Sequence, residues 1–212
     1  MRRLELGAAP LRVLAVGAHP DDIEIGCGGT LLRLADEGRV AALTWHVATG
    51  DPVRAAETAA AAREIAGQVA LTIDQRSLPD GRLPVALADL KATLELLKPT
   101  QPDLILCPRR DDAHQDHRTM AEVVWQTFRD HLVLEYEIPK YDGDLVPPQV
   151  YVELPEAIVA RKIELLQRCF PSQRDRSWFS EEVFRSVLRL RGLEGAAASG
   201  YAEGFIARKL SI

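Results

Sequence analysis

Short hydrophobic runs alternate with amphipathic stretches along most of the chain. Each apolar run is typical of a buried strand, and each stretch that follows it has apolar residues at helical spacing. The predicted strands are residues 11–16, 40–48, 69–73, 103–107, 132–138, 150–154 and 205–210. The predicted helices are residues 28–34, 54–66, 86–97, 118–130, 155–169 and 181–191.

This alternation predicts an α/β fold with a mainly parallel sheet flanked by helices. The 212 residues, 47% of them hydrophobic, can bury one sizeable core. We therefore expect a single Rossmann-like domain over residues 1–212, with its active site at the carboxyl ends of the strands. The sequence lacks both G-x-G-x-x-G and G-x-x-x-x-G-K-[ST], so a dinucleotide is not implied.

Two clusters of polar residues come directly after predicted strands. The first is His19-Pro-Asp-Asp22, and the second lies within residues 108–117. Open parallel sheets bind ligands in the crevice beyond the carboxyl ends of their strands. Catalytic zinc typically takes three His or carboxylate ligands and leaves one position for water, and His19, Asp22 and His117 supply such a set.

The other polar residues of the two clusters suggest acid–base roles. Asp21 stands beside the predicted ligands, where it could take a proton from a metal-bound water of lowered pKa. His114 could stabilise a developing oxyanion or protonate a leaving amine. Asp116 could hydrogen-bond to a ring nitrogen of His114 and raise the pKa of that ring.

Each cluster also has a purely structural interpretation. The first could form a turn in which Asp22 caps the following helix. Asp111, Asp112 and Asp116 could be solvated charges of a loop. Two such clusters, each immediately after a strand, are harder to explain as turns, and this favours the metal site.

The remaining histidines and the cysteines point to structural roles. His46 lies within a predicted strand and His131 starts another. Cys27 is interpreted as a small residue that allows close packing beneath the site, and Cys107 and Cys169 as core residues. Three widely spaced cysteines without a CxxC pair suit a reducing cytosol, so we expect a cytoplasmic protein.

Charge and hydropathy narrow the class of partner. A net charge of −5 and an isoelectric point near 5.6 provide no basic face for nucleic acid. No apolar run reaches the roughly 18 residues of a transmembrane helix, so no membrane span is expected. Arg2 and Arg3 precede an apolar run, but Pro10 and Arg12 interrupt it, and we expect no signal peptide.

Taken together, the motifs resemble those of the PIG-L / LmbE-like family of zinc-dependent N-deacetylases. The matching segments are Gly17-Ala-His-Pro-Asp-Asp22, Gly26-Cys-Gly-Gly-Thr30, Leu78-Pro-Asp-Gly81, Asp112-Ala-His-Gln-Asp-His117 and Tyr201-Ala-Glu203. They run in order through nearly the whole predicted domain, and the pairing of His-Pro-Asp-Asp with His-x-Asp-His is the most specific part. The family removes acetyl groups from N-acetylglucosamine-type units on varied aglycones.

The resemblance implies a role for each matching residue. It makes His19, Asp22 and His117 the metal ligands. It makes Asp21 the general base for attack by a zinc-bound water. It makes His114 the oxyanion stabiliser or acid, oriented by Asp116. Arg54 and Asp80 fall where family members place sugar-contacting residues. The alternative interpretations are that Arg54 is a surface charge at the start of a helix and that Asp80 is an ordinary turn residue.

The resemblance also implies a substrate class, a small conjugate of an N-acetylated amino sugar. A non-sugar or thiol-conjugate amide and a non-catalytic metal- or sugar-binding module are the alternatives. Zn²⁺ is the expected cofactor, although Fe²⁺ suits the same donors. Residues 136–176 are expected to shape the substrate pocket, and Arg109 and Arg110 contact either an anionic aglycone or solvent. Family members often self-associate, so the resemblance also allows a homo-oligomer.

Overall fold

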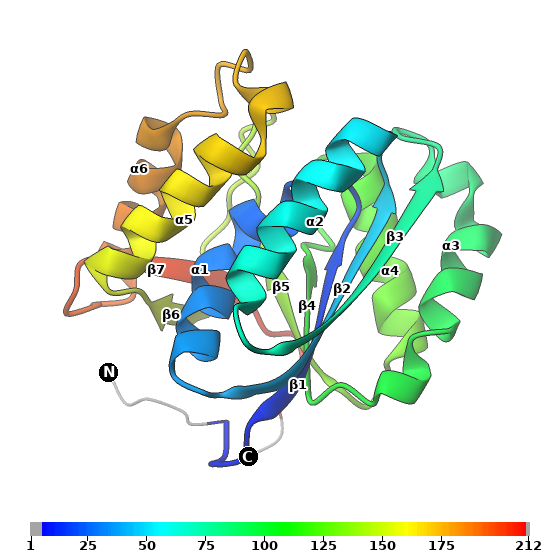
Figure 1. The fold of residues 1–212 in the computed structure, drawn as a ribbon, viewed down its shortest axis with the longest axis horizontal. Helices are drawn as coiled ribbons and strands as arrows, with labels where there is room; N and C mark the ends of the chain where they lie inside the picture. Colours follow the sequence, from blue (N-terminus) through cyan, green and yellow to red (C-terminus); the bar gives the residue numbers. More distant parts are fainter. Residues whose placement is uncertain (1–5, 211–212) are drawn as a thin grey trace.

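A sheet of seven strands lies at the centre of the fold (Figure 1). The structure is a computed structural model that describes residues 6–210. The strands are β1 (Leu11–Gly17), β2 (Val40–Thr49), β3 (Ala70–Leu78), β4 (Leu104–Pro108), β5 (Leu132–Tyr136), β6 (Val150–Glu153) and β7 (Ala202–Ile206). Their order across the sheet is β3-β2-β1-β4-β5-β7-β6. β7 runs antiparallel to β5 and β6, and the other neighbouring pairs are parallel, which confirms the predicted fold class.

Helices cover both faces of the sheet (Figure 1). One layer contains α1 (Asp22–Asp36), α2 (Pro52–Ala66), α5 (Glu156–Cys169) and α6 (Glu181–Glu194), and the other contains α3 (Leu87–Glu95) and α4 (Gln115–Thr127). Short 3₁₀ turns occur at Leu83–Val85, Lys98–Thr100 and Pro171–Gln173. Within residues 6–210, every helix is too short or too polar to cross a membrane.

Strand β1 is buried on both of its faces. Val13 and Ala15 belong to the core shared with α1, α2 and α5, whereas Leu14 and Val16 belong to the core shared with α3 and α4. A parallel strand covered on both faces appears in a sequence as a continuous apolar run. The apolar run at residues 11–16 therefore predicted this strand correctly.

The order of the strands places a crevice between β1 and β4. β1 pairs with β2 on one side and with β4 on the other, and the chain continues outward in both directions to β3 and β5. At such a switch point the connections after the two central strands lead to opposite sides and leave room for a ligand. The two polar clusters follow β1 and β4, so the topology brings them to this crevice.

Helix α1 begins at Asp22. The glycine-rich pattern predicted a later start, at residue 28, and this prediction was wrong. The glycines of this stretch allow close packing within the helix. A Cβ atom on Gly26 would lie 2.0 Å from the ring of Tyr136, and one on Gly29 would lie 2.5 Å from the side chain of Leu154. Packing against the sheet thus outweighs the low helix propensity of glycine.

Two strands differ from their predicted bounds because polar residues in them are paired. The last strand was expected at residues 205–210, but β7 starts earlier, where Glu203 is buried against Lys162. β3 continues past residue 73, where Asp74 lies 2.7 Å from the ring of the structural His46 on β2. In both places a polar partner on another element lets a polar residue occupy a strand position that the hydrophobic pattern excluded.

The buried pair of Lys162 and Glu203 joins the C-terminal elements to α1. Lys162 Nζ lies 2.6 Å from Glu203 Oε1, and it also donates to the backbone carbonyl of Ile25. The same carboxylate accepts the backbone N–H groups of Gly29 and Thr30, at 2.8 and 2.6 Å. Both charged side chains are 3% exposed, so each depends on the other for compensation of its charge.

Glu203→Ala and Lys162→Met should each lower the free energy of unfolding by about 3–5 kcal/mol, because either change leaves an unpaired buried charge. Urea unfolding followed by circular dichroism measures this loss. The control is Arg161→Met, which breaks the exposed pair with Asp36 and should cost no more than about 1 kcal/mol. If both buried variants lose as little unfolding free energy as the control, the two buried charges do not depend on each other.

Candidate active site

The turn between β1 and α1 is held together by the side chain of Asp22. Its Oδ2 atom accepts the backbone N–H groups of Ala18 and His19, both at 2.9 Å. Asp22 is the first residue of α1, and its carboxylate points back to the end of the strand. The interpretation of Asp22 as a helix cap is therefore wrong, because Asp22 is already the first residue of the helix and Asp21 is at the N-cap position.

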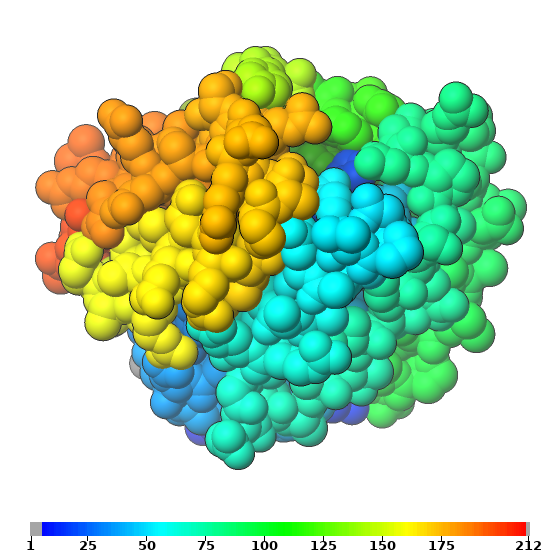
Figure 2. Space-filling model, turned by 45° about the horizontal axis from the view of Figure 1, so that its top comes forward, coloured from blue at the N-terminus to red at the C-terminus, as the bar shows by residue number. Residues whose placement is uncertain are grey.

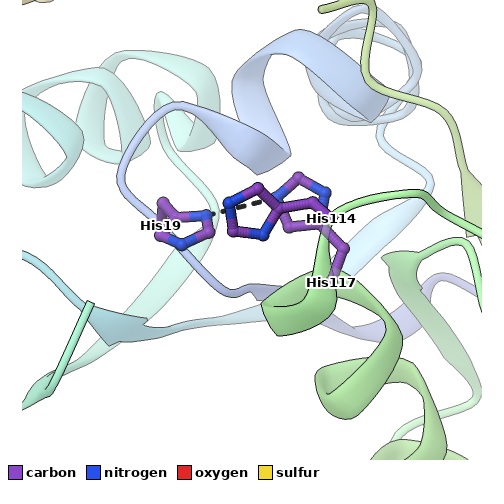
Figure 3. A group of neighbouring side chains, drawn as sticks. All are labelled: His19, His114 and His117. Carbon is purple, nitrogen blue, oxygen red and sulfur yellow. Dashed lines mark hydrogen bonds between the residues drawn. The ribbon is translucent and has the colours of Figure 1, made fainter. Parts of the chain in front are cut away.

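Three side chains converge beside this turn. His19 Nδ1 lies 3.1 Å from His117 Nε2, and the two oxygens of Asp22 lie 3.5 Å from the former and 3.3 Å from the latter. All three side chains are buried. Figure 3 shows His19 approaching from the turn after β1 and facing His117, which comes with His114 from the start of α4.

The spacing of these donors fits a divalent metal ion. A tetrahedral zinc ion with bonds of about 2.0–2.1 Å holds its ligand atoms about 3.3 Å apart. Two ring nitrogens 3.1 Å apart repel each other through their lone pairs unless a proton or a cation lies between them. Two groups within residues 6–210 have donor atoms that all lie within 4.8 Å of one another, His19 with His114 and His117, and His19 with Asp80 and Asp116, and neither includes Asp22. The set with Asp22 is favoured because its buried carboxylate meets both rings.

The outer nitrogen of each of these two histidines faces carboxylates. His19 Nε2 lies 3.2 Å from Asp116 Oδ2 and 3.2 Å from Asp80 Oδ1. His117 Nδ1 lies 3.2 Å from Asp112 Oδ1. Carboxylates in such positions set the orientation and basicity of histidine ligands. Asp112 and Asp116 are 1% and 0% exposed, so their interpretation as solvated loop charges is wrong.

Asp116 contacts a different histidine from the one that the sequence suggested. Its carboxylate accepts the backbone N–H groups of Gly81 and Leu83, at 2.7 and 3.0 Å, and lies against His19. Only its backbone N–H reaches His114, donating to Nδ1 at 3.2 Å, so neutral His114 carries its proton on Nε2. Burial and the neighbouring histidines lower the pKa of His114, contrary to the expected increase.

Sequence reasoning missed the contribution of Asp112. The available signal was an acidic residue that opens the segment Asp112-Ala-His-Gln-Asp-His117 directly after a buried strand. Asp112 Oδ1 also accepts the backbone N–H of His114, at 2.8 Å, and lies 2.9 Å from Lys140 Nζ. The carboxylate thus joins the loop after β4, the helix α4 and the loop after β5.

Asp21, the predicted base, lies beside the three donors and is 4% exposed. Its Oδ1 atom lies 3.1 Å from a guanidinium nitrogen of Arg54, whereas its buried Oδ2 atom has no hydrogen-bond partner within residues 6–210. Burial, partly offset by Arg54, raises the pKa of Asp21 to about 7. A carboxylate with that pKa and a free oxygen is suited to accept a proton near neutral pH.

The three arginines and the acid expected near substrate have different environments. Arg54 and Asp80 both reach the cluster, Arg54 through Asp21 and Asp80 through His19, and the Asp80 side chain is 62% exposed. Arg109 is buried and donates to the backbone and side chain of Asp144. Arg110, next to it, is exposed.

The cluster lies at the bottom of a hollow in the surface. Figure 2 shows dark-blue atoms from the region of the turn after β1 between the cyan start of α2, the green region around the start of α4 and the orange segment after α5. His114, which is only half-buried, and the exposed Asp80 mark the open side of the cluster. A substrate can therefore reach the donors from this side.

Comparison with known proteins identifies the family. Residues 14–128, more than half of the chain and including both polar clusters, match the model of the PIG-L family, described as GlcNAc-PI de-N-acetylase. The chain belongs to the PIG-L family. The resemblance found in the sequence is thereby confirmed. The PIG-L chain is also 31% identical to the "Uncharacterized deacetylase YaiS" of Escherichia coli K12 over 167 residues, 74% of this chain and 89% of that protein.

Solved structures share the fold at lower identity. An N,N′-diacetylchitobiose deacetylase from Pyrococcus horikoshii matches with a TM-score of 0.73 and 21% identity over 92% of this chain and 83% of its own. GalB, a 4-carboxy-2-hydroxymuconate hydratase from Pseudomonas putida KT2440, matches with a TM-score of 0.77 and 15% identity over 95% and 98%. The same fold therefore hosts different reactions, and the side chains of the site decide the chemistry.

Asp112→Asn should weaken metal binding about 10- to 100-fold, because it removes the negative charge beside His117 Nδ1. Competition with a chromogenic chelator measures the dissociation constant. The matched control is Asp111→Asn, an exposed neighbour that pairs with Arg208 and should leave metal affinity unchanged. Equal affinities for the Asp112 variant and the wild type would show that this carboxylate does not support the ligand.

The apparent affinity for metal should rise with pH between 7 and 9. Although burial opposes protonation, Asp22 and Asp112 raise the pKa of His117 to about 9 in the metal-free protein. Below that pH an incoming ion must displace a proton from the ring, and this competition disappears as pH rises through the pKa. Titration calorimetry in buffers of different ionisation enthalpy should detect the released proton. An affinity that is constant from pH 7 to 9, without proton release, would exclude His117 as a ligand.

Proposed function

We propose that this PIG-L protein is a metal-dependent hydrolase that removes the acetyl group from an N-acetylated amino sugar on a small conjugate. The observation that supports this most directly is the position of Asp21. A buried carboxylate oxygen without a hydrogen-bond partner lies next to three converging metal donors. This arrangement suits the activation of water beside a metal-held carbonyl group.

The metal ligands in this proposal are His19, Asp22 and His117. Two imidazole nitrogens and one carboxylate suit Zn²⁺, and leave a coordination position open for reaction. A bound Zn²⁺ ion would polarise the amide carbonyl and lower the pKa of water. The carboxylates of Asp116 and Asp112 hold the two rings from behind, so the ligands are oriented before the ion binds.

The residues of the chain then divide the proton transfers between them. Asp21 Oδ2 takes a proton from the attacking water, while Arg54 holds the other oxygen of the same carboxylate. His114 keeps its proton on Nε2, because its Nδ1 atom is occupied as an acceptor, and this N–H group donates a hydrogen bond to the oxyanion that develops on the carbonyl oxygen. When the C–N bond breaks, the leaving amine takes the proton that Asp21 received from the water.

The proposed substrate class rests on the family and on the open side of the site. The matching family model describes de-N-acetylation of an N-acetylglucosamine conjugate, and one solved relative is a diacetylchitobiose deacetylase. The exposed Asp80 borders the donors and provides a hydrogen-bond partner for sugar hydroxyl groups. Residues 136–176 include the loop after β5 and the segment after α5, and we propose that they select the aglycone.

The test is metal-dependent release of amine from N-acetylglucosamine, its inositol and malate conjugates, diacetylchitobiose and an N-acetylated aminoglycoside. Each substrate is incubated with chelator-treated protein and with the same protein reconstituted with Zn²⁺ or Fe²⁺. Release that requires the metal supports the proposal, and the best substrate identifies the aglycone. If one ion binds per chain but no sugar is deacetylated, the activity belongs to a non-sugar amide or the protein only binds its ligand.

Asp21→Asn should retain the metal and lower kcat by about 10²- to 10⁴-fold, because the amide cannot act as the base. His19→Ala should instead lose the metal, which elemental analysis of the dialysed protein detects. Asp89→Asn, an exposed carboxylate on α3, is the control and should match the wild type in both measurements. Near-normal kcat in the Asp21 variant would assign the base to another residue.

A further inference from the structure

We propose that Arg54 is a positioning residue for Asp21. It holds one carboxylate oxygen and the preceding backbone carbonyl, and so keeps the second oxygen of Asp21 free at the reaction site. This inference rests on the proposed function. It differs from the sugar-contacting role that the family resemblance implies for Arg54.

Arg54 makes two contacts with the same turn. One guanidinium nitrogen lies 3.1 Å from Asp21 Oδ1, and this nitrogen also donates to the backbone carbonyl of Pro20. The side chains of Arg54 and Asp21 are 20% and 6% exposed, so the ion pair is shielded from most solvent. The two contacts fix both the carboxylate and the peptide plane that precedes it.

The turn needs such support because the backbone of Asp21 is unfavourable. Its φ angle is 97°, in the left-handed region that residues other than glycine rarely adopt. Asp21 precedes α1 as its N-cap residue, yet its side chain makes no capping hydrogen bond. Within residues 6–210, Oδ2 has no partner, so the contact of Oδ1 with Arg54 orients the carboxylate.

Arg54 is itself held in place at the start of α2. The Asp51 side chain caps this helix by accepting the backbone N–H groups of Val53 and Arg54, both at 2.9 Å. One turn further along the same side of α2, Thr58 Oγ1 donates to Glu24 Oε1 at 2.6 Å and joins α2 to α1. The backbone that carries the guanidinium group is therefore fixed relative to α1.

Arginine has the chemistry that this position needs. Its planar guanidinium group presents several N–H donors in a rigid fork, whereas a lysine ammonium is a single point charge on a flexible stem. One terminal nitrogen of the group meets both the Pro20 carbonyl and the Asp21 carboxylate, and its two N–H bonds are fixed in the guanidinium plane. Arg54→Lys should keep the charge but lose this orientation in part, and Arg54→Met should lose both.

The first measurement separates positioning from substrate contact. In the metal-loaded protein, Arg54→Met should lower kcat about 100-fold, as expected when a reacting group is misplaced, and leave KM within about twofold. Arg54→Lys should recover part of kcat, and the metal content should equal that of the wild type. Arg63→Met, on the exposed face of the same helix, is the matched control. A rise in KM with kcat retained would overturn the proposal.

A double substitution sharpens this distinction. If Arg54 acts through Asp21, then Arg54→Met should change kcat by no more than about twofold in a protein that already contains Asp21→Asn. A residue that contacts the sugar would still lower the rate in that background. If the kcat of the double variant is lowered by the product of the two single effects, the proposal is overturned.

A third measurement does not depend on turnover. In metal-free protein, the effects of Arg54→Met and Asp21→Asn on the unfolding equilibrium constant should be non-additive by about fivefold or more. Additive effects would show that the ion pair does not form, and the proposal would fall even if the enzyme is active. If the wild type deacetylates none of the substrates, the proposed function fails, and this cycle still decides whether Arg54 holds Asp21.

Discussion

The hydrogen bonds from the backbone of Ala18 and His19 to the Asp22 carboxylate are the contact on which the site depends. They fold the chain after β1 so that His19 and Asp22 lie together at the end of a buried strand. One oxygen of Asp22 is occupied by the backbone, and the other lies 3.3 Å from His117 on α4. Although burial opposes ionisation, the two histidines hold the pKa of Asp22 well below its usual range, so the carboxylate stays charged.

Around this turn, buried charges compensate one another in pairs. Asp112 and Asp116 each contact an imidazole, and Lys140 lies 2.9 Å from Asp112. Buried charges are tolerated only when they are paired or bind a metal ion, so this density of charge marks a functional centre. Asp21 is paired with Arg54 through one oxygen, and its other oxygen is buried beside the donors without a hydrogen-bond partner within the described residues.

Much of the fold could be predicted because its strands are buried on both faces. The apolar runs at β1, β2 and β4 lie between two helical layers, and such strands leave a clear signal. The strands at the periphery were harder to place. β3 contains Asp74 and β7 contains Glu203, and their partners, His46 and Lys162, are distant in the sequence. A hydrophobic pattern cannot indicate a polar residue that is buried by pairing.

The sequence alone was enough to predict the fold class, the family and the meeting of the two polar clusters, since these depend on local patterns and on short motifs after strand ends. Tertiary structure decided which atoms meet. The Asp116 carboxylate binds Gly81, Leu83 and His19 instead of His114, because the turn after β3 lies against the start of α4. It also decided that Arg54 faces Asp21, because α1 and α2 pack side by side. Contacts between distant segments follow from packing, which no local motif contains.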